Sequence, residues 1–107
     1  MLQHTVHPGE VLKEELDALG VSAAELARQI AVPPNRLSQI INGKRAVTGD
    51  TALRLGHWFR IDPQFWMNLQ AQFELVNAQK AEGDNIMALP TRAAMSEQAG
   101  AAEAGIK

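Results

Sequence analysis

The chain has 107 residues, of which 46% are hydrophobic, and a net charge of −2, which suits one globular domain with a terminal segment. It contains no cysteine, so disulfides and thiolate metal sites are excluded. No apolar run reaches membrane-spanning length and no signal peptide is recognisable, so we expect a cytoplasmic protein without a membrane partner.

The charged residues are unevenly distributed along the chain. Residues 26–60 carry six basic side chains and one acidic side chain, whereas residues 1–25 and residues 61–107 are both net acidic. A basic central region between acidic ends predicts two faces with different partners. The alternative is a chance clustering of solvated charges.

The first helix is predicted to begin at His7, with His7 as the capping residue, Pro8 in the first turn and Glu10 as an acid near the helix start. Gly20 should end it. Its apolar stripe should comprise Leu12, Leu16 and Leu19. His4 lies three residues before His7, but the chain has no cysteine and the nearest acid is Glu10, so we expect no metal site.

Two short helices joined by a tight turn are predicted between Ser22 and Arg45. Ser22 can cap the first of them, and Glu25 is placed to complete a capping box. Its buried face should comprise Leu26, Ala27 and Ile30. Pro33 disfavours a helical conformation in the residue before it, and Pro34 suits the first turn of the second helix.

The second short helix should have a buried stripe and a polar outward face, and Gly43 should end it. The buried stripe should comprise Leu37, Ile40 and Ile41. Side chains of the kind that read base edges and contact phosphates make up the outward face: Asn35, Arg36, Ser38, Gln39 and Asn42. Lys44 and Arg45 follow directly, as phosphate contacts would. This pattern predicts a helix-turn-helix whose second helix enters DNA. The alternative is an ordinary helical hairpin with a solvated polar face.

Two more helices are predicted after this hairpin. Thr48 should cap the fourth helix, and Asp62 with Pro63 should start a fifth helix that runs to about Gln79. The apolar stripe of the fifth helix is wider than a small core needs, and it includes Phe65, Trp66, Leu69 and Phe73. We favour a dimerisation surface there, because helix-turn-helix proteins usually bind DNA as two copies. The alternative is that the whole stripe packs inside one chain.

The composition changes from Lys80 onward, where aromatic residues disappear and Ala, Gly, Glu, Gln and Ser dominate. Glycines at 83, 100 and 105, together with Pro90, should interrupt any long helix. Such a segment cannot bury enough apolar surface to offset its ordering entropy. We therefore expect a domain over residues 1–79 and a low-complexity flexible tail over residues 80–107, with a weak helix over residues 92–103 as its one exception.

Three segments, HPGEVLKEELDALGVSAAELARQIAV, LSQIINGKRAVTGDTALRLGHWF and DPQFWMNLQAQFEL, resemble the HigA/VapI-type antitoxins of the XRE/Cro-like helix-turn-helix family. The resemblance covers roughly residues 5–77. It implies an all-α, five-helix Cro/lambda-repressor-like domain. It also implies a cytosolic antitoxin that neutralises a HigB toxin, an endoribonuclease of the RelE type that cleaves mRNA at the ribosome. Such an antitoxin represses the shared operon as a homodimer on a palindromic operator in double-stranded DNA.

By position, the resemblance assigns roles to two sets of residues. The base-reading set is Pro34, Asn35, Arg36, Ser38 and Gln39. The set that contacts the DNA backbone is Ser22, Asn42, Lys44 and Arg45. The chain departs from the broader Cro-like pattern at Ala31, where a turn glycine is common, and at Pro34, where a hydrogen-bonding side chain often begins the reading face. The change at Pro34 leaves base readout to fewer residues.

No catalytic motif competes with this interpretation. The chain has no Gly-rich phosphate loop, no HExxH sequence and no Ser/His/Asp grouping placed by a motif, so we expect no enzyme activity, no cofactor and no small-molecule ligand. The alternative function is a stand-alone transcriptional repressor without a toxin partner. For the toxin contact, the acidic outer face of the first helix and the acidic C-terminal region are both candidates.

Overall fold

The computed structural model describes residues 5–99, and every regular element within that range is a helix. The helices are α1 (Pro8–Leu19), α2 (Ala23–Gln29), α3 (Pro34–Ile41), α4 (Gly49–Phe59), α5 (Pro63–Met87) and α6 (Arg92–Ala99). The all-α prediction and its five domain helices are confirmed. By packing, the chain divides into Met1–Asn77 and Ala78–Lys107. Whether residues 1–79 fold and function by themselves stays a prediction.

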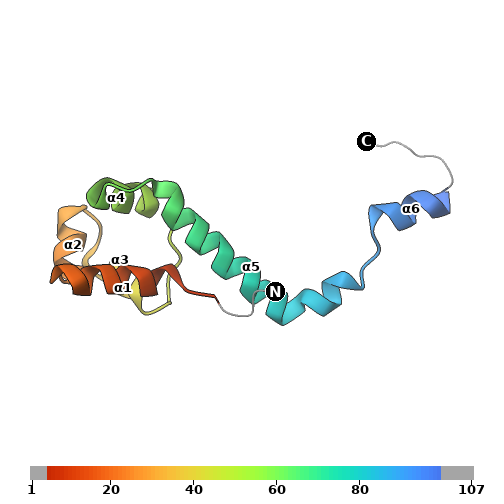
Figure 1. Ribbon diagram of the computed structural model, residues 1–107, viewed down its shortest axis with the longest axis horizontal. Coiled ribbons are helices and arrows are strands. Elements are labelled where there is room, and N and C mark those ends of the chain that lie inside the picture. The colour runs from red at the N-terminus through yellow and green to blue at the C-terminus, as the bar shows by residue number, and fades with distance from the viewer. Residues whose placement is uncertain (1–4, 100–107) are drawn as a thin grey trace. The chain divides into compact units, whose positions relative to one another are not determined.

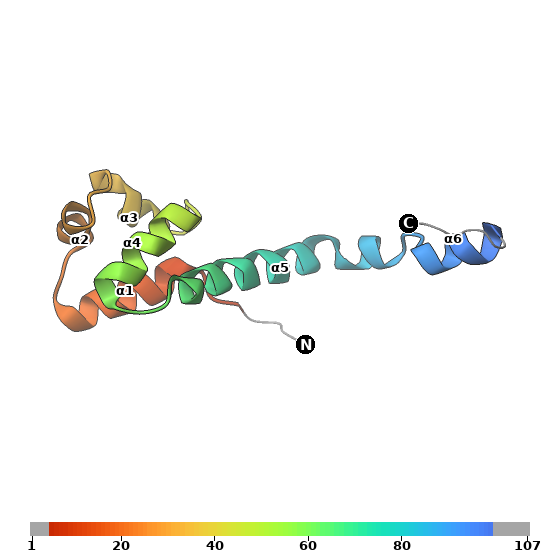
Figure 2. The same ribbon diagram turned by 90° about the horizontal axis from the view of Figure 1, so that it is seen from above.

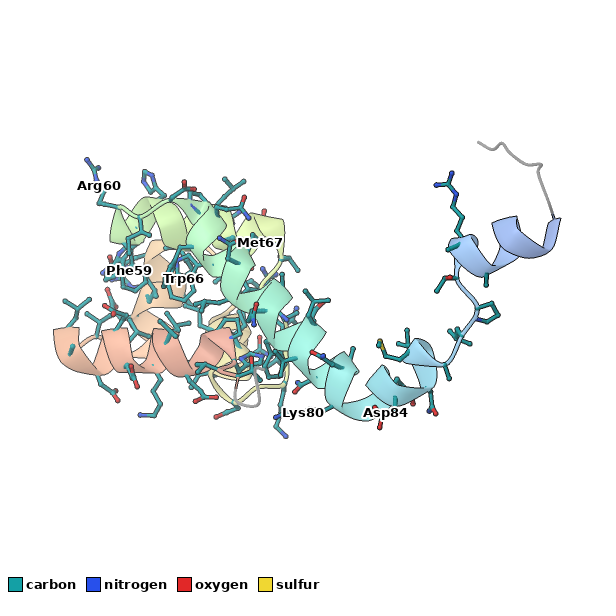
Figure 3. The ribbon with its side chains drawn as sticks, turned by 45° about the vertical axis from the view of Figure 1, so that its right-hand side comes forward. Phe59, Arg60, Trp66, Met67, Lys80 and Asp84 are labelled. Atoms are coloured by element: carbon teal, nitrogen blue, oxygen red, sulfur yellow. The ribbon has the colours of Figure 1, made fainter. Side chains whose placement is uncertain are left out.

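The first unit is built around one hydrophobic core, to which α1, α2, α3, α4 and the first turns of α5 contribute (Figures 1 and 2). Its buried residues are Leu12, Leu16, Leu26, Ala27, Ile30, Leu37, Ile40, Val47, Ala52, Leu55 and Trp66. Helix α3 packs against both α2 and α1. Phe59 and Trp66 join α4 to α5, with ring centroids 5.7 Å apart (Figure 3). The orientation of α3 is therefore fixed by several other helices.

Side chains at the helix starts account for several of the boundaries. His7 Nδ1 accepts a 2.9 Å hydrogen bond from the Gly9 N–H, and the Glu10 carboxylate accepts from the His7 N–H, which completes a capping box on α1. Ser22 Oγ accepts from the Glu25 N–H at 3.0 Å, as expected. The Glu25 carboxylate, however, binds Arg28 and Gln29, so the capping box predicted for α2 is only half formed.

One glycine allows α1 and α3 to approach each other closely. A Cβ atom at Gly9 would lie 1.9 Å from the main-chain oxygen of Ile40. No real Cβ contact is that short, so only glycine fits where the start of α1 meets α3. This close contact between backbones helps to set the position of α3.

Two expectations about α1 and α5 were wrong. The sequence predicts Leu19 in the buried stripe of α1, yet Leu19 is 55% exposed because it is the last residue before the Gly20 turn. The fifth helix was expected to end near Gln79, but it continues to Met87. Gly83 does not interrupt it, because one glycine costs a helix only about 1 kcal/mol and Lys80, Ala81 and Glu82 before it are good helix formers.

The second unit contains the end of α5 and all of α6. Every residue from Ala78 to Met95 is exposed, apart from the half-buried Gly83, so these described residues form no core of their own. Within the predicted weak helix, α6 spans Arg92–Ala99, and Thr91 Oγ1 accepts from the Ala94 N–H at 3.3 Å. The remainder of that prediction, together with the expectations for Gly100, Gly105 and His4, lies outside the described residues.

Candidate nucleic-acid interface

The turn between α2 and α3 is held by a residue in the left-handed conformation. Ala31 has φ +60°, and the Val32 N–H donates to the Ala27 carbonyl at 3.0 Å to close the turn. This is the position at which the sequence carries alanine where glycine is common. The turn is therefore formed at some cost in backbone strain, because a Cβ atom disfavours positive φ.

Most of the predicted base-reading residues lie at the surface of α3. Pro34 and Asn35 are exposed at its start, while Ser38 and Gln39 are half-buried. Ser38 Oγ donates to the Asn35 carbonyl at 3.1 Å, and Gln39 Oε1 accepts from Arg45 Nε at 2.8 Å. These contacts hold the polar side chains in place at the surface where a ligand could reach them.

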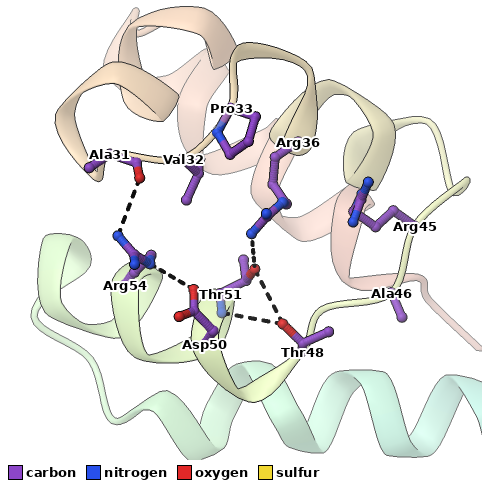
Figure 4. Close-up of a pocket in the computed structure, with 10 residues that line it drawn as sticks. All are labelled: Ala31, Val32, Pro33, Arg36, Arg45, Ala46, Thr48, Asp50, Thr51 and Arg54. Carbon is purple, nitrogen blue, oxygen red and sulfur yellow. Dashed lines mark hydrogen bonds and ion pairs between the residues drawn. The ribbon is translucent and has the colours of Figure 1, made fainter.

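Arg36 lies differently from the rest of this set. Its side chain is half-buried and turns toward α4, where Nη1 donates to Thr51 Oγ1 over 3.4 Å (Figure 4). Arg36 Nε is buried and has no hydrogen-bond partner among the described residues. To reach a base edge, as the sequence predicted, this side chain would have to leave Thr51.

The predicted backbone-contacting residues surround the two ends of the helix-turn-helix. Asn42 is the C-cap residue of α3. Gly43 follows it in the left-handed conformation, with φ +74°, as predicted for the residue that ends this helix. The Lys44 N–H donates to the Gln39 carbonyl at 2.8 Å, which leaves the exposed Lys44 and Arg45 side chains next to the end of α3. Ser22 is exposed at the start of α2.

Two residues that position this surface were not found from the sequence. Arg54 on α4 donates through Nη1 to the Ile30 carbonyl at 2.8 Å and through Nε to Asp50 at 2.7 Å, which ties α4 to the end of α2. Gln70 on α5 is buried, and its Oε1 accepts from the Val47 N–H at 2.9 Å. This bond fixes the loop that carries Lys44 and Arg45. Both contacts join residues more than 20 positions apart, so no local pattern could reveal them.

The electrostatic character of the surface is basic. Arg36, Arg45 and Arg54 line one cavity, and Asp50 is the acidic residue among its lining. The hydrogen bond from Arg54 lowers the pKa of Asp50, and the nearby Arg36 acts in the same direction. Asp50 therefore stays ionised in an environment dominated by guanidinium groups.

Neither a membrane span nor a metal cluster is present in the part of the chain that the structure describes. Across residues 5–99, no helix combines the length and apolar character that crossing a bilayer requires. The same residues contain no group of three or more His, Asp or Glu side chains arranged to hold a metal ion.

The fold, the exposed polar face of α3 and the basic loop after it define a protein of the helix-turn-helix class, and residues 12–66 match the helix-turn-helix family. This chain is 43% identical to virulence-associated protein I of Dichelobacter nodosus over 76 residues, which cover 70% of this chain and 70% of that protein.

Solved structures give a closer assignment. An addiction module antidote protein of the HigA family from Coxiella burnetii superposes with a TM-score of 0.80 at 45% identity, covering 82% of this chain and 97% of that one. The Pseudomonas aeruginosa antitoxin HigA, solved with the higBA promoter, gives a TM-score of 0.80 at 37% identity, covering 83% of this chain and 98% of that one. The chain belongs to the HigA-type antitoxins of the helix-turn-helix family, which are DNA-binding proteins and not enzymes.

Proposed function

We propose that this antitoxin binds a palindromic operator in double-stranded DNA as a homodimer, represses its own operon, and neutralises a HigB/RelE-like toxin that cleaves mRNA. The observation that carries the DNA part is the exposed polar face of α3, followed directly by Lys44 and Arg45. It occurs on a fold that the P. aeruginosa antitoxin HigA shares, and that protein was solved with the higBA promoter.

On DNA, α3 would lie in the major groove. Asn35, Ser38 and Gln39 carry hydrogen-bonding groups for base edges, and Pro34 stands beside them at the helix start. Phosphate contacts would come from the two ends of the motif, namely Ser22, Asn42, Lys44 and Arg45. Such contacts fix the register of the protein on the duplex, whereas the α3 side chains choose the sequence.

The dimer surface proposed on α5 is smaller than the one the sequence suggested. Phe65, Leu69 and Phe73 follow one another at four-residue spacing on α5, and Phe65 is 40% exposed. Trp66 is only 1% exposed and packs in the core, so we withdraw it from the dimerisation set. Phe73 is half-buried, with its ring against that of His7 at 4.7 Å. Phe65 is therefore the residue best placed to meet a second copy, whereas Leu69 is half-buried and packs against the core.

Toxin neutralisation rests on the family assignment and on charge. The outer face of α1 carries exposed Glu14 and Asp17, and the Lys13 ammonium is bound to the Asp17 carboxylate at 2.8 Å. An acidic surface suits a protein whose partner must bind RNA and is basic for that reason. The acidic C-terminal region is the second candidate, and deletion of residues 80–107 distinguishes the two.

Co-expression with the neighbouring open reading frame tests the proposal. The expected result is that the chain restores growth when that frame is toxic and co-purifies with its product. Lys44→Ala is the matched control, because it should weaken DNA binding and leave rescue unchanged. A neighbour that is harmless and does not co-purify would support the alternative of a stand-alone repressor.

A further inference from the structure

We infer that the cavity between α3 and α4 binds one phosphate group, and that a phosphodiester of the operator backbone occupies it, an inference that rests on the proposed function. The cavity has a volume of about 390 Å³ and opens beside the turn that precedes α3 (Figure 4). Its charged and hydroxyl-bearing lining residues are Arg36, Arg45, Thr48, Asp50, Thr51 and Arg54.

The charges of the lining favour an anion. Three guanidinium groups face one carboxylate, and Asp50 is already engaged by Arg54 at 2.7 Å. The Asp50 side chain is 62% exposed, so it lies at the rim of the cavity and does not fill it. The lining therefore keeps a net positive charge after its one ion pair has formed.

Arg36 is the residue that most clearly lacks a partner. A guanidinium has five N–H donors, and the contact of Arg36 within the described residues is one long hydrogen bond of 3.4 Å to a neutral hydroxyl. Its Nε is buried and unpaired among those residues. A phosphate oxygen pair matches the planar donor fork of arginine better than any neutral group does.

The start of α4 adds donors to the same space. Thr48 Oγ1 donates to Thr51 Oγ1 at 3.5 Å, and the Thr51 hydroxyl can in turn donate to an oxyanion. They stand at the first turn of α4, an eleven-residue helix whose positive dipole end favours negative charge. Arginine, hydroxyl and helix dipole thus converge on one cavity.

The position of the cavity identifies the source of the phosphate group. The turn from Ala31 to Pro33 forms one wall, and Asn35, a base-reading candidate, follows within the first turn of α3. A phosphodiester held there would fix the depth of α3 in the groove. Arg36 then contacts phosphate and does not read a base, which replaces the role that the family resemblance assigned to it.

A titration with inorganic phosphate tests the cavity without DNA. We expect saturable NMR shift changes at the Asp50 and Thr51 amides of the wild-type protein, and none with chloride at the same ionic strength. Arg36→Gln should abolish them. Arg60→Gln is the matched control, because Arg60 ends α4 at the opposite terminus and points away from the protein (Figure 3). If wild-type shifts do not saturate, or if Arg60→Gln abolishes them equally, the inference is wrong.

Duplexes that each carry one neutral methylphosphonate identify the source of the phosphate group. At one phosphate position in each half-site, the methylphosphonate should weaken binding of the duplex to the wild-type protein by about tenfold or more. Arg36→Gln should lose the same affinity and become insensitive at that position alone, while Arg60→Gln should behave like wild type. Arg36→Lys keeps the positive charge but loses the planar pair of N–H donors. Its loss of affinity at that position should lie between those of the wild type and Arg36→Gln.

Three results would overturn the inference. In one, Arg36→Gln changes base preference and stays sensitive to every methylphosphonate, which makes Arg36 a base reader. In another, inorganic phosphate binds the cavity, but Arg36→Gln leaves the sensitivity to every methylphosphonate position unchanged. The occupant is then a free anion and not a phosphodiester of DNA. In the third, wild type binds no promoter duplex, so the proposed function fails along with the DNA source, although the titration still decides whether the cavity takes phosphate.

Discussion

At the scale of single residues, Ala31 holds the turn between α2 and α3 at φ +60°. Ala31→Gly should stabilise the protein, because removing the Cβ relieves strain of roughly 1–2 kcal/mol, which outweighs the roughly 0.4–1 kcal/mol of extra unfolded-chain entropy. The measurement is the free energy of unfolding in urea. Ala71→Gly is the control, since Ala71 is exposed within α5 and glycine there should destabilise by about 0.5–1 kcal/mol. A loss of stability in Ala31→Gly would show that the turn carries no strain.

His7 links the start of α1 to solution pH. Burial lowers the pKa of His7 below its ordinary value of 6.5, and the nearby Glu10 carboxylate opposes this in part. Because the folded state resists protonation, the contribution of His7 to stability is complete above pH 6.5 and is lost as the pH falls through that value toward the lower folded pKa. Protonation of Nδ1 would also remove the acceptor for the Gly9 N–H.

His7→Asn tests this linkage, because asparagine can cap α1 but does not titrate. Unfolding free energies between neutral pH and about pH 5 should fall for the wild type and stay nearly level for the variant. Equal slopes for the two proteins would assign the pH dependence to other groups.

At the scale of elements, the crossing of α1 and α3 depends on Gly9. Gly9→Ala would force the two backbones apart, since the added Cβ would lie 1.9 Å from the Ile40 oxygen. We expect a loss of about 3 kcal/mol or more in the free energy of unfolding, together with weaker DNA binding. Gly49→Ala is the matched control, because a Cβ there meets nothing within 4 Å and stability should be nearly unchanged. If Gly9→Ala is as stable as Gly49→Ala, the close approach of α1 and α3 does not matter.

The elements also show what the sequence could and could not predict. The caps at His7 and Ser22 and the stop at Gly43 depend on neighbours within a few residues, so local pattern was sufficient. Gln70 bonds Val47 and Arg54 bonds Ile30 across the fold, so their roles became visible only in three dimensions.

Trp66 shows a second limit of the sequence. Helical periodicity placed it on an apolar stripe with Phe65 and Leu69, but it cannot say how far that stripe is covered. The structure buries Trp66 and leaves Phe65 partly exposed. The roles assigned to the α3 side chains stay predictions until DNA binding is measured.

At the scale of the whole molecule, we predict that Phe65→Glu yields a monomer. A carboxylate would be buried unpaired between two copies, and loss of the second half-site should weaken operator binding roughly 100-fold or more. Sedimentation at micromolar concentration together with operator binding measures both effects. Leu75→Glu is the control, because Leu75 is 68% exposed on α5 and lies outside the row of Phe65, Leu69 and Phe73. A wild-type monomer under these conditions would contradict the dimer.

In that dimer the two α3 helices should lie about 34–36 Å apart, the spacing of successive major grooves on one side of DNA. This spacing links the position of the dimer surface to the position of the reading face. Each half-site would then meet one copy of Asn35, Ser38 and Gln39.

Binding to operator and scrambled duplexes across a salt series tests the central claim most directly, namely that α3 reads DNA while the loop after it holds the backbone. Gln39→Ala should lose about 1–3 kcal/mol of preference for the operator and retain affinity for the scrambled duplex. Lys44→Ala should weaken binding to both duplexes. It should also reduce the slope of log affinity against log salt concentration by roughly one unit. If the wild type binds both duplexes with equal affinity at every salt concentration, α3 does not read sequence and the account is contradicted.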